Sequence, residues 1–82
     1  MIKVLFFASL RDQLKISELQ LESAENPDVN KLIDNLIAQG PLWDKAFSNK
    51  SIMIAVNQTM SKKSCVLNAG DEVAFFPPVT GG

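Results

Sequence analysis

One segment has the spacing of an amphipathic helix, and it limits what the rest of the chain can fold into. Between residues 29 and 37 the apolar side chains recur at intervals of three and four, which places them in a single stripe. They are Val29, Leu32, Ile33, Leu36 and Ile37. The N-cap is either Asn26, with Pro27 in the first turn, or Asp28, and Gly40 followed by Pro41 ends the helix. Because only one stripe is apolar, this helix must pack against another layer.

The other regular segments have the composition of strands. They are rich in β-branched, aromatic and aliphatic residues, and the one around Leu19 and Leu21 alternates apolar and polar residues as a half-buried edge strand does. The predicted strands are residues 2–7, 18–22, 51–56, 59–60 and 72–76. Asn57 and Gln58 form the turn between the third and fourth strands, and Gly70 supplies a positive φ before the last one.

Two short segments complete the prediction. Residues 8–14 form a helical turn or a wide loop, with Ser9 as a possible cap. Residues 42–47 form a short helix in which Trp43 and Phe47, four residues apart, share one apolar face. Packing of these two rings against the core is the favoured interpretation, and a docking site is the alternative.

The order of elements predicts an α+β fold in which one main helix lies across one face of a mixed sheet, with residues 1–82 forming a single domain. If the more apolar strand faces meet the helix, alternation sends the intervening side chains to the open face. These are Leu5, Phe7, Met53, Ala55, Ala74 and Phe76. Such a face is too apolar for a solitary monomer and predicts a protein partner. The alternatives are that the faces are assigned wrongly or that the Trp43 helix covers this surface.

Composition excludes several classes of function. Lys plus Arg number 8 against 9 Asp plus Glu, and a net charge of −1 gives no electrostatic reason to bind nucleic acid or anionic lipid. The apolar run near the N-terminus is interrupted by Arg11 and Asp12 before it reaches the length of a signal sequence, and no segment approaches the roughly 20 apolar residues of a membrane span. We therefore expect a cytoplasmic protein without a membrane partner.

Side-chain chemistry is sparse. The chain has no histidine, which removes histidine-based nucleophilic catalysis and histidine-ligated zinc, and no metal site is expected. Cys65 is the only thiol. A small, partly buried structural cysteine is favoured over a nucleophile, because only Lys62 and Lys63 stand near enough in sequence to activate it. The acidic residues show no spacing that pairs two of them for acid–base catalysis.

The C-terminal segment, residues 77–82, is the remaining candidate. Pro77 and Pro78 cannot continue a strand, so the chain should leave the body after Phe76. The last residues, Val79, Thr80, Gly81 and Gly82, then form a thin tail that can enter a narrow channel. The alternative is a frayed end. A terminal carboxylate on Gly82 needs activation, for instance as an acyl-adenylate made by an ATP-dependent partner, before its acyl group can pass to an amine or to sulfur.

Four stretches carry a resemblance to a known family. They are residues 75–82, residues 70–74, residues 55–59, and residues 1–8 followed by Arg11. Together they resemble the small, sulfur-carrying subunits of molybdopterin synthase. The resemblance spans the whole chain, although residues 15–50 agree in pattern more than in identity. It implies the ubiquitin-like β-grasp fold.

The resemblance also implies a mechanism. An adenylating enzyme similar to those that activate ubiquitin uses ATP to form a transient acyl-AMP on Gly82, and a persulfide sulfur donor converts it to a thiocarboxylate. The tail then enters the large subunit of a heterotetrameric synthase, which supplies the catalytic lysine, and sulfur passes to a cyclic pyranopterin. No cofactor is bound permanently, and whether the carrier itself counts as an enzyme stays open. The implied partner-binding residues are Phe7, Arg11, Met60 and Phe76.

Other functions stay open at this point. A sulfur carrier for thiamine synthesis or tRNA thiolation has the same fold, although the Pro-Pro-Val-Thr-Gly-Gly ending favours the molybdopterin branch. A ubiquitin-like protein modifier would join its terminal glycine to a lysine. A β-grasp interaction module would undergo no chemistry at all.

Overall fold

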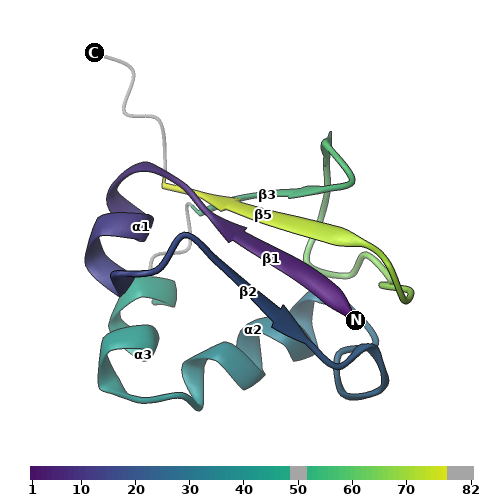
Figure 1. Ribbon diagram of the computed structural model, residues 1–82, viewed down its shortest axis with the longest axis horizontal. Coiled ribbons are helices and arrows are strands. Elements are labelled where there is room, and N and C mark those ends of the chain that lie inside the picture. The colour runs from purple at the N-terminus through teal and green to yellow at the C-terminus, as the bar shows by residue number, and fades with distance from the viewer. Residues whose placement is uncertain (49–51, 78–82) are drawn as a thin grey trace.

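The computed structural model describes residues 1–48 and 52–77, and in this part of the chain a five-stranded mixed sheet carries its helices on one face (Figure 1). The strands are β1 (Ile2–Phe6), β2 (Glu18–Leu21), β3 (Met53–Val56), β4 (Thr59–Met60) and β5 (Glu72–Phe76). The helices are α1 (Ala8–Leu14), α2 (Val29–Ile37) and α3 (Pro41–Phe47), with a 3-10 turn, η1, at Ser23–Glu25. The predicted α+β class is confirmed.

The first and last strands are neighbours at the centre of the sheet. The strand order is β2-β1-β5-β3-β4, and β1 pairs with β5 in parallel, with Val4 opposite Val73 and Phe6 opposite Phe75. The other pairs are antiparallel. A parallel pair requires a long crossover between its strands, and here that crossover contains α1, α2 and α3. β2 lies at an edge, as its alternating sequence predicted.

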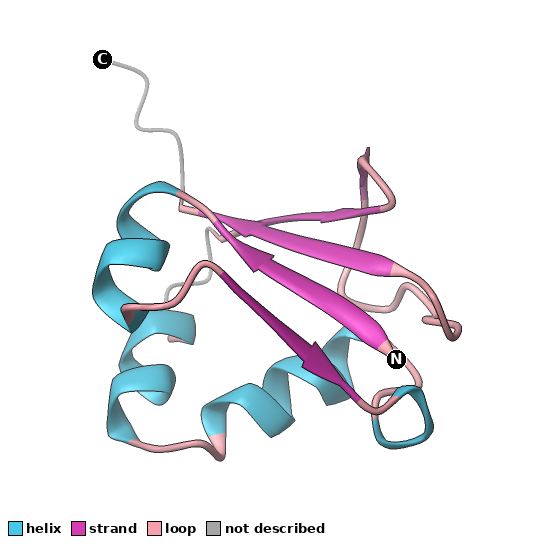
Figure 2. Cartoon of the chain, in the orientation of Figure 1, coloured by secondary structure: helices cyan, strands magenta, loops and turns pink. Residues whose placement is uncertain are grey.

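One face of the sheet forms the core with the helices. Its side chains are all buried, and α2 packs its apolar stripe against them. The strands contribute Ile2, Val4, Phe6, Ile54, Val56, Val73 and Phe75, and α2 contributes Val29, Leu32, Ile33 and Leu36. Figure 2 shows α2 and α3 on the same side of the strands. The face assigned to the core from strand alternation is therefore correct.

The structure decides how α2 begins. Asp28 is the N-cap, because its side chain accepts a hydrogen bond of 2.8 Å from the backbone N–H of Lys31. Asn26 is buried instead, where its side chain donates to the carbonyl of Glu22 and accepts from the amide of Asn35. An aspartate N-cap such as Asp28 contributes about 1 kcal/mol to the stability of the folded protein. α2 ends at Ile37 with Ala38 as its C-cap, ahead of the predicted stop at Gly40. Gly40, with φ of 148°, is instead the N-cap of α3, which begins at Pro41.

The segment after β1 is a helix, and Ser9 does not cap it, so that prediction was wrong. The N-cap is Phe7, without a side-chain cap bond, and α1 starts one residue before Ser9. Ala8 has a φ of 52°, a conformation that turns the chain sharply out of the strand. The serine hydroxyl therefore lies inside the first turn, past the position from which a cap accepts.

Both aromatic rings of α3 pack on the core. Trp43 and Phe47 meet the ring of Phe6 edge to face, at centroid distances of 5.6 Å and 6.2 Å. Phe47 also meets Phe75 at 5.0 Å. The core interpretation of this pair is confirmed, and α3 does not cover the opposite face of the sheet.

The predicted turns are also present. Asn57 and Gln58 have φ of 50° and 67°, the backbone of a two-residue hairpin between β3 and β4. Gly70 has a φ of 91° ahead of β5. Asp71 then links the two turns, because it accepts 2.8 Å from the backbone N–H of Asn68 and 3.0 Å from the Asn57 amide. These two bonds lower the pKa of Asp71, the backbone bond more than the amide.

Candidate functional site

The sheet face away from the helices, here called the open face, presents its side chains in three rows. Strand register defines them, since residues opposite one another in a sheet share a face. The row nearest the C-terminal end of β5 contains Met53 and Phe76. The second contains Glu18, Leu5, Ala74, Ala55 and Met60, and the third contains Gln20, Lys3 and Glu72. The open face is thus apolar at one end and charged at the other.

An aromatic pair stands at the apolar end. The rings of Phe7 and Phe76 stack with centroids 4.8 Å apart and planes 9° from parallel. The backbone N–H of Phe7 donates to the carbonyl of Phe75 at 3.1 Å, which extends the β1–β5 pairing to the residue that carries the first ring. Phe7 remains 38% exposed, and Met60, on the neighbouring hairpin, is 56% exposed. These side chains are large apolar anchors without a cover in the part of the chain that the structure describes.

A hollow of about 440 Å³ lies between these anchors. It is lined by Leu5, Phe7, Ala55, Gln58, Met60, Glu72, Ala74 and Phe76. Its floor is the adjacent pair Ala55 and Ala74, which are only 6% and 8% exposed. The prediction placed both on the open face correctly, but larger neighbours bury their methyl groups. We call this feature the alanine hollow.

Five of its lining residues were not predicted as functional. Gln58 was assigned to the turn alone, and Glu72 to the surface or a turn. The other three, Leu5, Ala55 and Ala74, were assigned only to the open face. Counting back in twos from Phe76 through Ala74 reaches Glu72, so alternation contained the signal that places it here.

The predicted partner-binding residues do not all meet. Phe7, Met60 and Phe76 line the same hollow. Arg11 is exposed on α1 and is not among the residues lining it. The structure therefore groups three of the four predicted residues.

The predicted tail begins at the aromatic pair. Pro77, half-buried, directly follows Phe76. The rest of the predicted tail, Pro78, Val79, Thr80, Gly81 and Gly82, lies outside the described residues. Whatever the tail does, its root is fixed beside the exposed aromatic stack.

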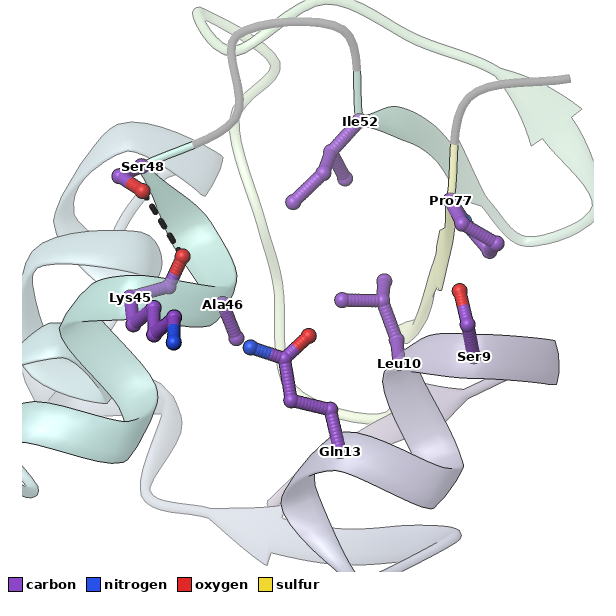
Figure 3. A pocket seen from close by; sticks show the side chains of 8 residues that line it. All are labelled: Ser9, Leu10, Gln13, Lys45, Ala46, Ser48, Ile52 and Pro77. Atoms are coloured by element: carbon purple, nitrogen blue, oxygen red, sulfur yellow. Dashed lines mark hydrogen bonds between the residues drawn. The ribbon is translucent and has the colours of Figure 1, made fainter. Parts of the chain in front are cut away.

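A second hollow, of about 430 Å³, lies on the helical side of Pro77. It is lined by Ser9, Leu10, Gln13, Lys45, Ala46, Ser48, Ile52 and Pro77 (Figure 3). The Ser48 hydroxyl donates 2.8 Å to the carbonyl of Lys45. The figure shows the side chains of Leu10 and Ile52 pointing into the space between α1, α3 and the sheet. The root of the tail therefore has hollows on both sides, of which the alanine hollow is the more apolar.

Cys65 has the surroundings of a structural residue. Its side chain is partly buried and packs against the core, and its sulfur lies 3.6 Å from the carbonyl oxygen of Val66. The favoured interpretation from the sequence is supported. Among residues 1–48 and 52–77, no cluster of three or more acidic or cysteine side chains could hold a metal ion.

No helix within the described ranges is long and apolar enough to cross a membrane.

Comparison with protein families identifies the chain's relatives. The model described as the ThiS family matches residues 4–82, a range that includes the aromatic pair, the hollow and the tail. The chain belongs to the ThiS family. It is 44% identical over 82 residues, the full length of both chains, to the molybdopterin synthase sulfur carrier subunit of Escherichia coli (strain K12). It is 37% identical, again over the full length of both, to the protein of the same name from Haemophilus influenzae. The resemblance found in the sequence is confirmed.

Solved structures show the same fold. SAMP1 from Haloferax volcanii superposes with a TM-score of 0.79 at 24% identity, covering 99% of this chain and 98% of that one. A subunit from the complex of subunits 1 and 2 of the molybdopterin-converting factor of Helicobacter pylori gives a TM-score of 0.71 at 22% identity, covering 99% and 97%. At these identities the likeness concerns the fold, and it confirms the ubiquitin-like β-grasp architecture.

Proposed function

We propose that this chain is the sulfur carrier subunit of a molybdopterin synthase. The observation that carries the proposal is the position of the exposed Phe7–Phe76 stack, one residue before Pro77. Because the tail begins next to this stack, a protein that binds the open face can bind the tail at the same time. Sequence identities of 44% and 37%, over the full length of two molybdopterin synthase sulfur carrier subunits, support this function over other activities of the same fold.

The length of the tail fits this role. Five residues follow Pro77, and an extended chain spans at most about 3.5 Å per residue, so the upper limit of the distance from Pro77 to Gly82 is roughly 17 Å. A partner docked on the open face can hold its reactive centre at that distance. Glycine at the last two positions lets the end enter a channel too narrow for side chains.

The chemistry takes place on the carboxylate of Gly82. One carboxylate oxygen attacks the α-phosphorus of ATP on a ubiquitin-activating-like enzyme, which releases pyrophosphate and leaves an acyl-AMP. The outer sulfur of a persulfide donor attacks the acyl carbon and displaces AMP, which leaves an acyl disulfide between Gly82 and the donor. A second thiol of the donor or a thiol reductant then attacks the donor sulfur, forms a disulfide with it and releases the thiocarboxylate. This chain has no histidine and only a partly buried structural cysteine, so the catalytic side chains belong to the partners.

The acceptor partner is the large subunit of the synthase. It binds the open face, takes in the tail and directs sulfur to a cyclic pyranopterin, and two copies of each subunit form a heterotetramer. In this role the carrier is a detachable substrate that moves between two partners and holds no cofactor of its own.

Mass spectrometry of the C-terminal peptide tests this function. The chain is produced together with its adenylating enzyme and sulfur donor, and the C-terminal peptide is analysed. A replacement of oxygen by sulfur on Gly82 is expected, and it should be absent when Gly82 is deleted or followed by an extra residue. Conjugates to lysines of other proteins would instead identify a protein modifier. An unmodified carboxylate under these conditions would reject both roles.

A further inference from the structure

The floor of the alanine hollow is formed where the second row of the open face has its smallest side chains. Ala55 and Ala74 lie opposite each other on β3 and β5, and Leu5 and Met60 flank them on β1 and β4. The two small side chains therefore sit between larger ones at the middle of the sheet. A row of this shape is concave, and in the described part of the chain nothing fills it.

The walls of the hollow differ in chemistry. One end is closed by the Phe7–Phe76 stack, and the other by Glu72. Lys3 lies opposite Glu72 in the register, but its ammonium group makes its ion pair with Glu18, at 4.0 Å. Among the described residues no cation lies within ion-pair distance of Glu72. The hollow thus combines an apolar floor with an acidic group at the end away from the tail.

We propose that the alanine hollow is a socket for one bulky apolar side chain of the synthase large subunit, and that a lysine or arginine of the same subunit binds Glu72. This inference rests on the proposed function. Two observations indicate this occupant. The hollow is continuous with the Phe7–Phe76 stack, from which the tail begins, and the negative charge of Glu72 attracts a basic side chain. Fully desolvated pockets that receive an anchor side chain carry a large share of binding energy in protein interfaces. The socket sets how the large subunit sits on the sheet, and therefore how the tail enters it.

Filling the socket tests the proposal without damaging the core. Ala55 and Ala74 point away from the helices, so a larger side chain at either position does not overpack the buried face. Ala74→Leu and Ala55→Leu should each keep the thermal stability of the parent protein. Each should weaken binding to the large subunit about tenfold or more, because a filled socket excludes the anchor. Ala24→Leu, at an exposed position of η1 far from the hollow in the fold, is the matched control and should bind normally.

The acidic wall has its own test. Glu72→Lys should weaken binding to the large subunit about tenfold, and Glu72→Gln should reduce the dependence of the association rate on salt, because one attractive charge is lost. Glu25→Lys makes the same charge change on the exposed η1 and is the control. Association is measured by calorimetry and by stopped-flow mixing with the purified large subunit.

The outcomes separate this inference from the function itself. If the parent protein forms the thiocarboxylate and binds the large subunit, but the leucine variants bind equally well, the socket is rejected and the function stands. Loss of thiocarboxylate formation with unchanged large-subunit binding would assign the hollow to the adenylating enzyme and reject the proposal as stated. If the parent protein neither carries sulfur nor binds the large subunit, the proposed function and the socket are both rejected.

Discussion

The two faces of the sheet can be compared through two neighbouring pairs of phenylalanines, one on each face. Phe6 and Phe75 stack on the core side at 6.0 Å, and Phe7 and Phe76 stack on the open side at 4.8 Å. The first two rings are 2% and 0% exposed, whereas Phe7 is 38% exposed. The two pairs have the same residue type and come from neighbouring positions of the same two chain segments. They differ in what covers them: the helices cover Phe6 and Phe75, and no described element covers Phe7 and Phe76. The covered pair therefore stabilises the fold, whereas the uncovered pair is available to a partner.

The largest effect is expected on the core side. Phe75→Ala removes a ring that contacts Phe6 and Phe47, so the unfolding free energy should fall by about 3–5 kcal/mol. Urea unfolding followed by circular dichroism measures this. A loss below about 1 kcal/mol would show that the helices cover this face less tightly than its burial indicates.

The matched substitution on the open side should reverse the balance. Phe76→Ala loses one partly exposed stacking contact and should cost about 1 kcal/mol of stability. Binding to the large subunit should weaken about tenfold to a hundredfold, as expected for an exposed aromatic anchor. Phe7→Ala, which removes the other ring of the stack, should give the same pattern. The comparison between the faces fails if either substitution mainly unfolds the protein.

A change confined to the helical layer should affect stability alone. Asp28→Ala removes the N-cap of α2 and should lower the unfolding free energy by about 1 kcal/mol. Affinity for the large subunit should stay within experimental error, since α2 lies on the other side of the sheet. A clear loss of affinity in this variant would mean that the helical layer takes part in docking.

The smallest effect is expected at the end of the sheet, where Asp71 joins the two turns. Its pKa in the folded protein lies below the unfolded value of about 3.9, because the Asn68 N–H and the Asn57 amide hydrogen-bond to the carboxylate. Its stabilising contribution is therefore present above about pH 4 and is lost as the pH falls through the folded pKa. The melting temperatures of the parent protein and Asp71→Asn should differ at about pH 6 and converge as the pH falls through the folded pKa. A constant difference across this range would exclude a role for the charge.

Local sequence patterns were sufficient for most of the elements. The stripe of α2, the composition of the strands and the period-2 alternation predicted the helix, the strands and both sheet faces. They also placed Phe7 and Phe76 on the open side. These features depend on residues that are close together in the sequence, and the sequence alone therefore predicts them.

Features that depend on distant neighbours could not be read in the same way. The pairing of β1 with β5 joins residues about 70 positions apart and leaves no local signal. The start of α1 depends on the positive φ of Ala8, which alanine rarely adopts, so the sequence pointed to Ser9 instead. The alanine hollow exists because strands from separate parts of the chain bring larger side chains around Ala55 and Ala74. The roles of Gly82 and of the tail stay a prediction, made from the prolines and glycines of residues 77–82 and from the resemblance.

The central place of β5 also affects synthesis of the protein. β5 lies between β1 and β3, so the two halves of the sheet have no direct contact through strand pairing until residues 72–76 have left the ribosome. Non-local, parallel pairing of this kind is slow to form, because the long intervening loop must close first. Residues 77–82 are made after β5, the strand that joins the two halves of the sheet. A chain that stalls before β5 therefore lacks both the strand that joins the two halves of the sheet and the Gly81–Gly82 segment on which the proposed function depends.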